Sequence, residues 1–89
     1  MKAVVTVVGK DRVGIIAGVC VQLAEFNVNV LDISQTVMQG YFTMMMVVDV
    51  SMSNVPLAQL AQTLDEKGKE MGLSIRLQRE DIFEAMHRI

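Results

Sequence analysis

The chain has few of the residues that supply the chemistry of most enzymes and metalloproteins. Its 89 residues include one cysteine, one histidine, one proline and no tryptophan. A single cysteine excludes a disulfide or a sulfur-based metal site within one chain, and it fits a reducing, cytoplasmic setting. Metal binding is disfavoured as well, because no second histidine or ligand cluster accompanies the first. We therefore expect neither a metal nor a cofactor.

A large positive charge and a long apolar segment are also missing. Eight basic and ten acidic residues give a net charge of −2, which disfavours nucleic acid and anionic membranes as partners. The apolar run between Thr43 and Val50 is too short to span a bilayer. The first residues enter a strand pattern without the apolar region of a signal peptide. These features predict a soluble, cytoplasmic protein.

The residues that are present indicate one domain with an aliphatic core. Apolar residues make up 52% of the chain and aromatic residues only 4%, so Val, Ile, Leu and the eight methionines must supply most of the core. A chain of this length buries about 60% of the surface that its unfolded state exposes. It has room for one core, and no linker or low-complexity stretch divides it. We therefore expect a single domain over residues 1–89.

Hydrophobic periodicity predicts an ordered series of strands and helices. A β-branched apolar run typical of a central strand is followed by apolar residues at helical spacing from Ile15 onward. Gln39 and Gly40 form a two-residue connection that predicts a tight hairpin. Pro56 suits the first turn of a second helix, and Gly72 suits its end. The expected strands cover residues 3–8, 30–38, 41–50 and 73–78, the expected helices 15–27 and 56–72, and a short amphipathic helix about 81–89.

This order of elements is two β-α-β units in tandem. Such units form the ferredoxin-like fold, in which a four-stranded antiparallel sheet carries two helices on one face. Right-handed crossovers leave few other ways to connect the elements. We therefore predict an α+β fold, a ferredoxin-like βαββαβ two-layer sandwich with an extra short C-terminal helix.

The second face of that sheet is expected to carry an apolar strip. Its members would be either Val4 and Val8 or Val5 and Val7, beside either Met45 and Val47 or Met44, Met46 and Val48. Monomers seldom expose such a patch, so a partner subunit, the C-terminal helix or both should cover it. Alternatively, polar Thr6, Thr43 and Asp49 make the face tolerable in water. The free backbone of an edge strand offers a second route to a dimer.

Two segments carry a family resemblance. Residues 9–16 read GKDRVGII, and residues 27–33 read NVNVLDI. They closely resemble the start of an ACT domain, a regulatory module that commonly binds amino acids and whose first loop often reads D-R-P-G-I. Only Val13, in place of the proline, departs from that pattern. Segments 32–35 and 40–42 are similar to small stand-alone bacterial ACT proteins and to the ACT repeats of the glycine-cleavage regulator.

The loop before the first helix is the expected ligand site. A glycine-flanked turn at a helix start presents unpaired N–H groups to a small anion, so the amides near Gly14 and Ile15 could hold an amino acid's carboxylate. Asp11 or the side-chain oxygen of Asn29 could accept its ammonium group. The resemblance implies that this asparagine belongs to the neighbouring subunit. The expected ligand-binding residues are Asp11, Arg12, Val13, Gly14, Ile15 and Asn29.

Each of these residues also has a purely structural interpretation. Asp11 could cap the first helix, and Gly14 could let that helix pack close to the sheet. Asn29 could simply begin a strand. Arg12 could be a solvated charge, and Val13 gives a looser loop than the family's proline would.

Other functions find little support in the sequence. His87 and Glu84 could share a helical face, but such a pair is far more often a surface contact than a catalytic dyad. Cys20 fits a small buried thiol better than a nucleophile. The first strand lacks the aromatic residues of RNA-recognition modules, and the first loop lacks the paired cysteines of a copper chaperone.

We therefore predict that the chain is not an enzyme and has no catalytic residues. The favoured function is a regulatory module that senses a small molecule, an amino acid above all, and assembles as a homo-oligomer, with a dimer preferred. The alternative is a ligand-free protein–protein interaction or oligomerisation module, in which a methionine-rich surface binds another protein.

Overall fold

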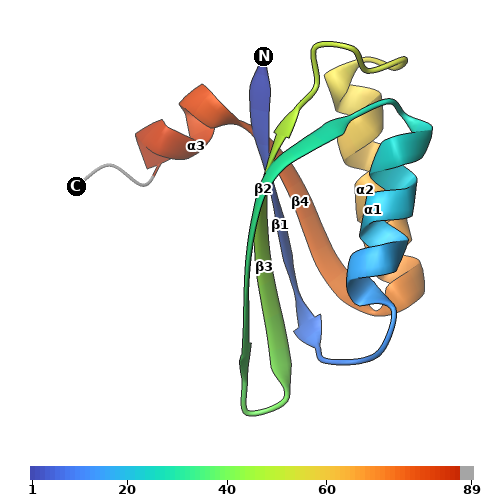
Figure 1. Ribbon diagram of the computed structural model, residues 1–89, viewed down its shortest axis with the longest axis vertical. Helices are drawn as coiled ribbons and strands as arrows, with labels where there is room; N and C mark the ends of the chain where they lie inside the picture. Colours follow the sequence, from blue (N-terminus) through green and yellow to red (C-terminus); the bar gives the residue numbers. More distant parts are fainter. Residues whose placement is uncertain (87–89) are drawn as a thin grey trace.

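Seven elements make up residues 1–86, the part of the chain that the computed structural model describes (Figure 1). In chain order they are β1 (Lys2–Lys10), α1 (Ile15–Glu25), β2 (Asn29–Met38), β3 (Tyr41–Asp49), α2 (Leu57–Met71), β4 (Leu73–Arg79) and α3 (Glu80–Met86). The predicted order is confirmed, and the boundaries of the first six elements lie within two residues of those expected. The predicted end of the last helix, over residues 87–89, lies outside the described residues.

The strands form one antiparallel sheet in the order β2-β3-β1-β4. Helices α1 and α2 lie on one face of this sheet, and α3 lies on the other (Figure 1). The two β-α-β units therefore interleave their strands, which leaves β2 and β4 at the edges. This arrangement confirms the ferredoxin-like sandwich with a small extra helix.

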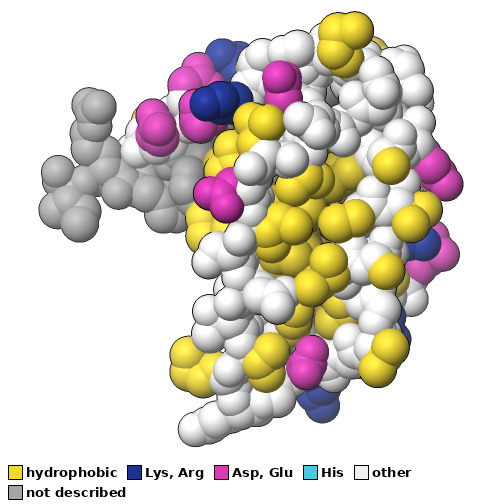
Figure 2. All heavy atoms as spheres, viewed as in Figure 1, with side chains coloured by type: hydrophobic (Ala, Val, Ile, Leu, Met, Phe, Trp, Pro, Cys, Tyr) yellow, Lys and Arg dark blue, Asp and Glu magenta, His cyan; other side chains and the backbone are white. Residues whose placement is uncertain are grey.

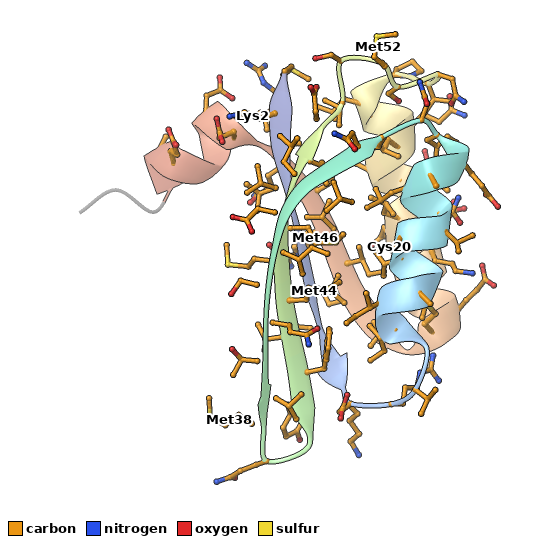
Figure 3. All side chains as sticks on the ribbon, viewed as in Figure 1. Lys2, Cys20, Met38, Met44, Met46 and Met52 are labelled. Atoms are coloured by element: carbon orange, nitrogen blue, oxygen red, sulfur yellow. The ribbon has the colours of Figure 1, made fainter. Side chains whose placement is uncertain are left out.

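The core lies between the sheet and the helices α1 and α2. Val5 and Val7 of β1 are fully buried there, beside Met44 and Met46 of β3. Figure 3 shows both methionines directed toward the helices. The helices contribute the buried residues Ile15, Val19, Leu23, Leu60 and Leu64. The structure thus assigns Val4, Val8, Met45 and Val47 to the opposite face.

A tight turn explains the sharp reversal between β2 and β3. Gln39 and Gly40 both have positive φ values, 50° and 82°. A type I′ turn needs this conformation at its two central residues, and its twist matches that of the flanking strands. The predicted hairpin is confirmed, with Met38 opposite Tyr41.

Close packing of α2 on β4 depends on Gly68. A Cβ atom added there would lie 2.8 Å from the backbone oxygen of Leu73, which cannot move aside without shifting the strand. We expect Gly68→Ala to lower the free energy of unfolding by about 1–3 kcal/mol, the usual cost of overpacking. Urea unfolding followed by circular dichroism measures this change.

The matched control is Gly18→Ala on α1. A Cβ atom at Gly18 would lie 3.0 Å from the terminal methyl group of Met71, a flexible side-chain end. The gain in helix propensity, up to about 1 kcal/mol, should offset the small rearrangement. Equal destabilisation by the two substitutions would contradict the packing explanation for Gly68.

Candidate functional site

The loop between β1 and α1 is open to solvent and tied to the β2–β3 hairpin. All four of its residues, 11–14, are exposed. The backbone N–H of Asp11 donates a hydrogen bond to the carbonyl oxygen of Gly40 at 2.8 Å. The hairpin tip therefore holds the entry of the loop in place.

The start of α1 presents free hydrogen-bond donors. Its first bond runs from the N–H of Gly18 to the carbonyl oxygen of Gly14, at 2.9 Å. The N–H groups of Ile15, Ile16 and Ala17 consequently have no partner within the helix. No side chain caps this end, and its first turn contains no acidic residue. The partial positive charge of the helix end is thus left without a compensating group from its own first turn.

Two structural interpretations of this loop are wrong. The residue at the N-cap of α1 is Gly14, and no side chain accepts a hydrogen bond there, so Asp11 does not cap the helix. Gly14 is not required for close packing either, because an added Cβ atom would meet nothing within 4 Å. Its φ of 92° is the reason for glycine, since L side chains rarely adopt that conformation.

The loop side chains differ in what they can offer a ligand. Arg12 and Val13 are exposed, and Val13 is as accessible as in an extended chain. The side chain of Ile15 is only 2% exposed because it packs in the core. Ile15 can therefore serve a ligand through its backbone N–H alone. The N–H groups of Ile16 and Ala17 were not among the ligand-binding groups predicted from the sequence. Every helix leaves its first N–H groups unpaired, so this rule could have identified them.

Asn29 lies at the opposite end of the sheet from the loop of its own chain. It pairs with Asp49, which pairs with Lys2 at the start of β1, whereas the loop follows Lys10. Eight residues of strand separate the two levels, about 27 Å at 3.4 Å per residue. The structure therefore does not bring Asn29 and the loop together within one chain. Asn29 instead borders a depression of about 230 Å³ with Ala24, Asn27 and Val28.

The Asn29 end of the sheet also holds a carboxylate with a perturbed pKa. Hydrogen bonds from the side chain and the backbone N–H of Ser51 lower the pKa of Asp49, and the backbone bond measures 2.9 Å. The ammonium group of Met1 lies 3.7 Å from the same carboxylate. These contacts join the start of β1 to the end of β3, far from the loop.

Groups expected to have no catalytic role are spread over the molecule. Cys20 is half-buried on α1 against the core, Glu84 is exposed on α3, and His87 lies outside the described residues. Among residues 1–86, no three His, Cys, Asp or Glu side chains are close enough to hold a metal ion. No helix in the same range is long and apolar enough to cross a membrane.

Comparison with known proteins connects this chain to one family. A family model described as an ACT domain matches residues 2–78. A UPF0237 protein of Clostridium acetobutylicum is 57% identical over 89 residues, and the match covers 100% of both chains. The solved structure of an ACT domain protein from Streptococcus pneumoniae has a TM-score of 0.83 and 45% identity, over 98% of both chains. A candidate glycine cleavage system transcriptional repressor has a TM-score of 0.73 and 25% identity, over 86% of this chain and 44% of its own.

Proposed function

The chain belongs to the ACT domain family, whose members are typically regulatory ligand-binding modules, and we propose that it senses an amino acid at the loop between β1 and α1. The observation that carries this proposal is the open start of α1. Its first three N–H groups have no partner within the helix, and the glycine before them leaves their approach unobstructed. A carboxylate is the natural ligand of such a helix end.

The ammonium group of the ligand needs oxygen acceptors. The exposed Asp11 supplies a carboxylate on the same loop. Asn29 of the partner subunit would supply a second acceptor, because the Asn29 of the same chain lies about 27 Å away by strand geometry. Ligand binding and subunit association are then thermodynamically linked, since the ligand favours the assembly that completes its site.

The exposed edge of β2 is the surface that would form the subunit interface in this proposal. Residues 31–40 are all exposed, and Leu31, Ile33 and Val37 are between 41% and 53% accessible. Figure 2 shows hydrophobic side chains gathered along the strip between β2 and α1. A long apolar edge strand is a template for pairing with another strand.

Hydrogen-bond directions along β2 support pairing with a second copy. In a two-residue hairpin the flanking residues form a hydrogen-bonded pair, so the N–H groups of Ile33, Gln35 and Val37 point away from β3. Consistently, the N–H of Ile33 donates to the side chain of Asp32 at 2.9 Å. Pairing would exchange this local bond for a bond to the second strand.

Antiparallel pairing also brings the two parts of the site together. A two-fold axis near Gln35 reverses the direction of the second β2, so the start of the partner's strand lies at the hairpin end of the first. The hairpin end is where the Gly40 carbonyl holds Asp11. Asn29 of the partner subunit would then lie beside the loop.

Thermal unfolding in the presence of each amino acid tests the ligand. A ligand at 100 times its dissociation constant stabilises the folded state by about 2.7 kcal/mol, which raises the melting temperature of a domain of this size by about 10 °C or more. We expect one amino acid or a related small set to produce such a shift. Absence of any shift, with another protein retained through purification, would favour the ligand-free interaction module instead.

A further inference from the structure

Within residues 1–86, helix α3 covers only one half of the sheet face opposite α1 and α2. It contacts β1 and β4 and has no contact with the other helices within residues 1–86. Val4, at the covered end of β1, is 5% exposed, whereas Val8 on the same face is 43% exposed. Figure 1 shows α3 projecting from one end of this face and the other end left bare. We call the bare part, around Val8, the open half.

The open half combines apolar side chains with hydroxyl groups. Strand register places Thr6 between Met45 and Arg76 in one row, and Val8 between Thr43 and Ser74 in the next. Exposed hydrophobic residues on this half are Val8, Met38, Tyr41 and Met45. Figure 3 shows Met38 directed away from the helices, opposite to Met44 and Met46. A contiguous apolar surface of this kind marks an interaction site.

The open half and α3 carry opposite charges. Lys10 and Arg76 lie on the open half by strand alternation, and the three ion pairs among residues 1–86 use neither of them. The acidic residues of α3 are Glu80, Asp81 and Glu84. Of these three, only Asp81 has an ion-pair partner among the described residues, Arg79 at 2.7 Å. Lys2 also lies at the helix end of this face by alternation, but the three acidic residues of α3 outnumber it, so the helix end is net acidic and the open half is basic.

We propose that two copies of the chain pack these faces together around a two-fold axis that runs across the strands, so that α3 of each copy covers the open half of the other. The axis reverses strand direction, which places the projecting helix of one copy over the bare half of its partner. The exposed Ile82 of α3 would meet the apolar side chains of the open half. The acidic residues of α3 would meet Lys10 and Arg76. The face of one copy is thus complementary to the same face of the other copy, as an interface around a two-fold axis requires.

The size of the face fits a reversible dimer. Four strands spaced about 4.8 Å apart and about 30 Å long make a sheet face of about 570 Å², of which the open half is about 290 Å². The α3 helix that packs on it buries a similar area of its own. The two symmetric contacts together would bury about 1,100 Å², just below the range of stable specific interfaces and within that of transient ones. This interface uses side chains on one face of the sheet and none of the outward backbone groups of the β2 edge, and it includes none of the loop residues 11–14.

Charge reversal on either side of the interface tests the proposal. Arg76→Glu makes the open half less basic, and Glu84→Lys makes α3 less acidic, so each variant alone juxtaposes like charges in two symmetric contacts. We expect each to raise the dissociation constant of the face-to-face dimer about tenfold or more. An equimolar mixture of the two should associate again, because each altered surface then meets a complementary one. Sedimentation velocity with one fluorescently labelled variant measures this recovery.

Matched variants separate this interface from misfolding and from the β2 edge. Met45→Lys should block the face, whereas Met52→Lys changes a methionine that is 73% exposed away from it and should not. Circular dichroism checks that all variants fold. A Gln35→Pro variant at the β2 edge should retain the face-to-face dimer and its sensitivity to Arg76→Glu. If both single charge variants associate like the wild type, or if their mixture shows no recovery, the proposal is overturned.

Discussion

Replacement of Gly14 by tryptophan is expected to abolish amino-acid binding, with a loss of affinity of at least about 100-fold. The φ of 92° at this position is one that L side chains rarely adopt, and it is unfavourable for a bulky residue such as tryptophan. The indole would also occupy the open space in front of the N–H groups of Ile15 and Ile16. Loss of about 100-fold in affinity corresponds to about 2.7 kcal/mol, which removes most of the thermal shift produced by the ligand. Titration calorimetry on the variant measures the loss directly.

Two further glycine variants control for backbone strain. Gly72 also has a positive φ, 70°, with open space around it, but it ends α2 rather than beginning a helix. Gly72→Trp should therefore cost stability without removing the ligand response. Gly14→Asn should retain most of the binding, because asparagine tolerates positive φ and leaves the amides in place. If Gly14→Trp folds and binds as tightly as the wild type, the ligand site lies elsewhere.

Replacement of Gln35 by proline is expected to disrupt association through the β2 edge. Proline removes the outward N–H of this residue without removing a bond to β3, because the inward donors belong to its neighbours. With a two-fold axis near Gln35, both copies lose a hydrogen bond at the centre of the interface. Two bonds at about 0.5–1.5 kcal/mol each weaken the dimer by a factor between about 5 and about 150. Analytical ultracentrifugation over a concentration series measures the change.

The conservative counterpart is Gln35→Thr, which keeps the N–H group and suits a strand. It should associate like the wild type. Because Asn29 of the partner subunit contributes to the proposed ligand site, Gln35→Pro should also weaken ligand binding, whereas Gln35→Thr should not. Full ligand affinity in a variant that no longer pairs through β2 would show that one chain binds the ligand alone.

The candidate site could be read from the sequence only where it depends on local geometry. A glycine before an amphipathic run marks a helix start, and every helix start has unpaired N–H groups, so the donors near Gly14 and Ile15 followed from the sequence. The sequence did not reveal that Asp11 lies too far from the helix to cap it, because that depends on where α1 begins. The contact between Asp11 and Gly40 joins segments that are far apart in the chain.

The position of Asn29 shows the same limit over a longer distance. Its residue type and its place at the start of a strand were evident, but its separation from the loop depends on strand register. Register is a property of the assembled sheet, in which β3 pairs with both β1 and β2. Only this pairing shows that a second subunit must supply the residue if Asn29 contributes to the loop site.

The sequence by itself determined the order of elements, their boundaries and the ferredoxin-like fold, because hydrophobic period, turn residues and crossover handedness are local or nearly local constraints. Tertiary structure decided which face of each strand is buried. Both faces of β1 carry valines, Val4 and Val8 on one and Val5 and Val7 on the other. The sequence pattern alone therefore cannot show which of the two faces is buried. The packing of α1 and α2 against Met44 and Met46 removes this ambiguity. This packing also leaves the opposite face to α3, which covers only half of it in the part of the chain that the structure describes.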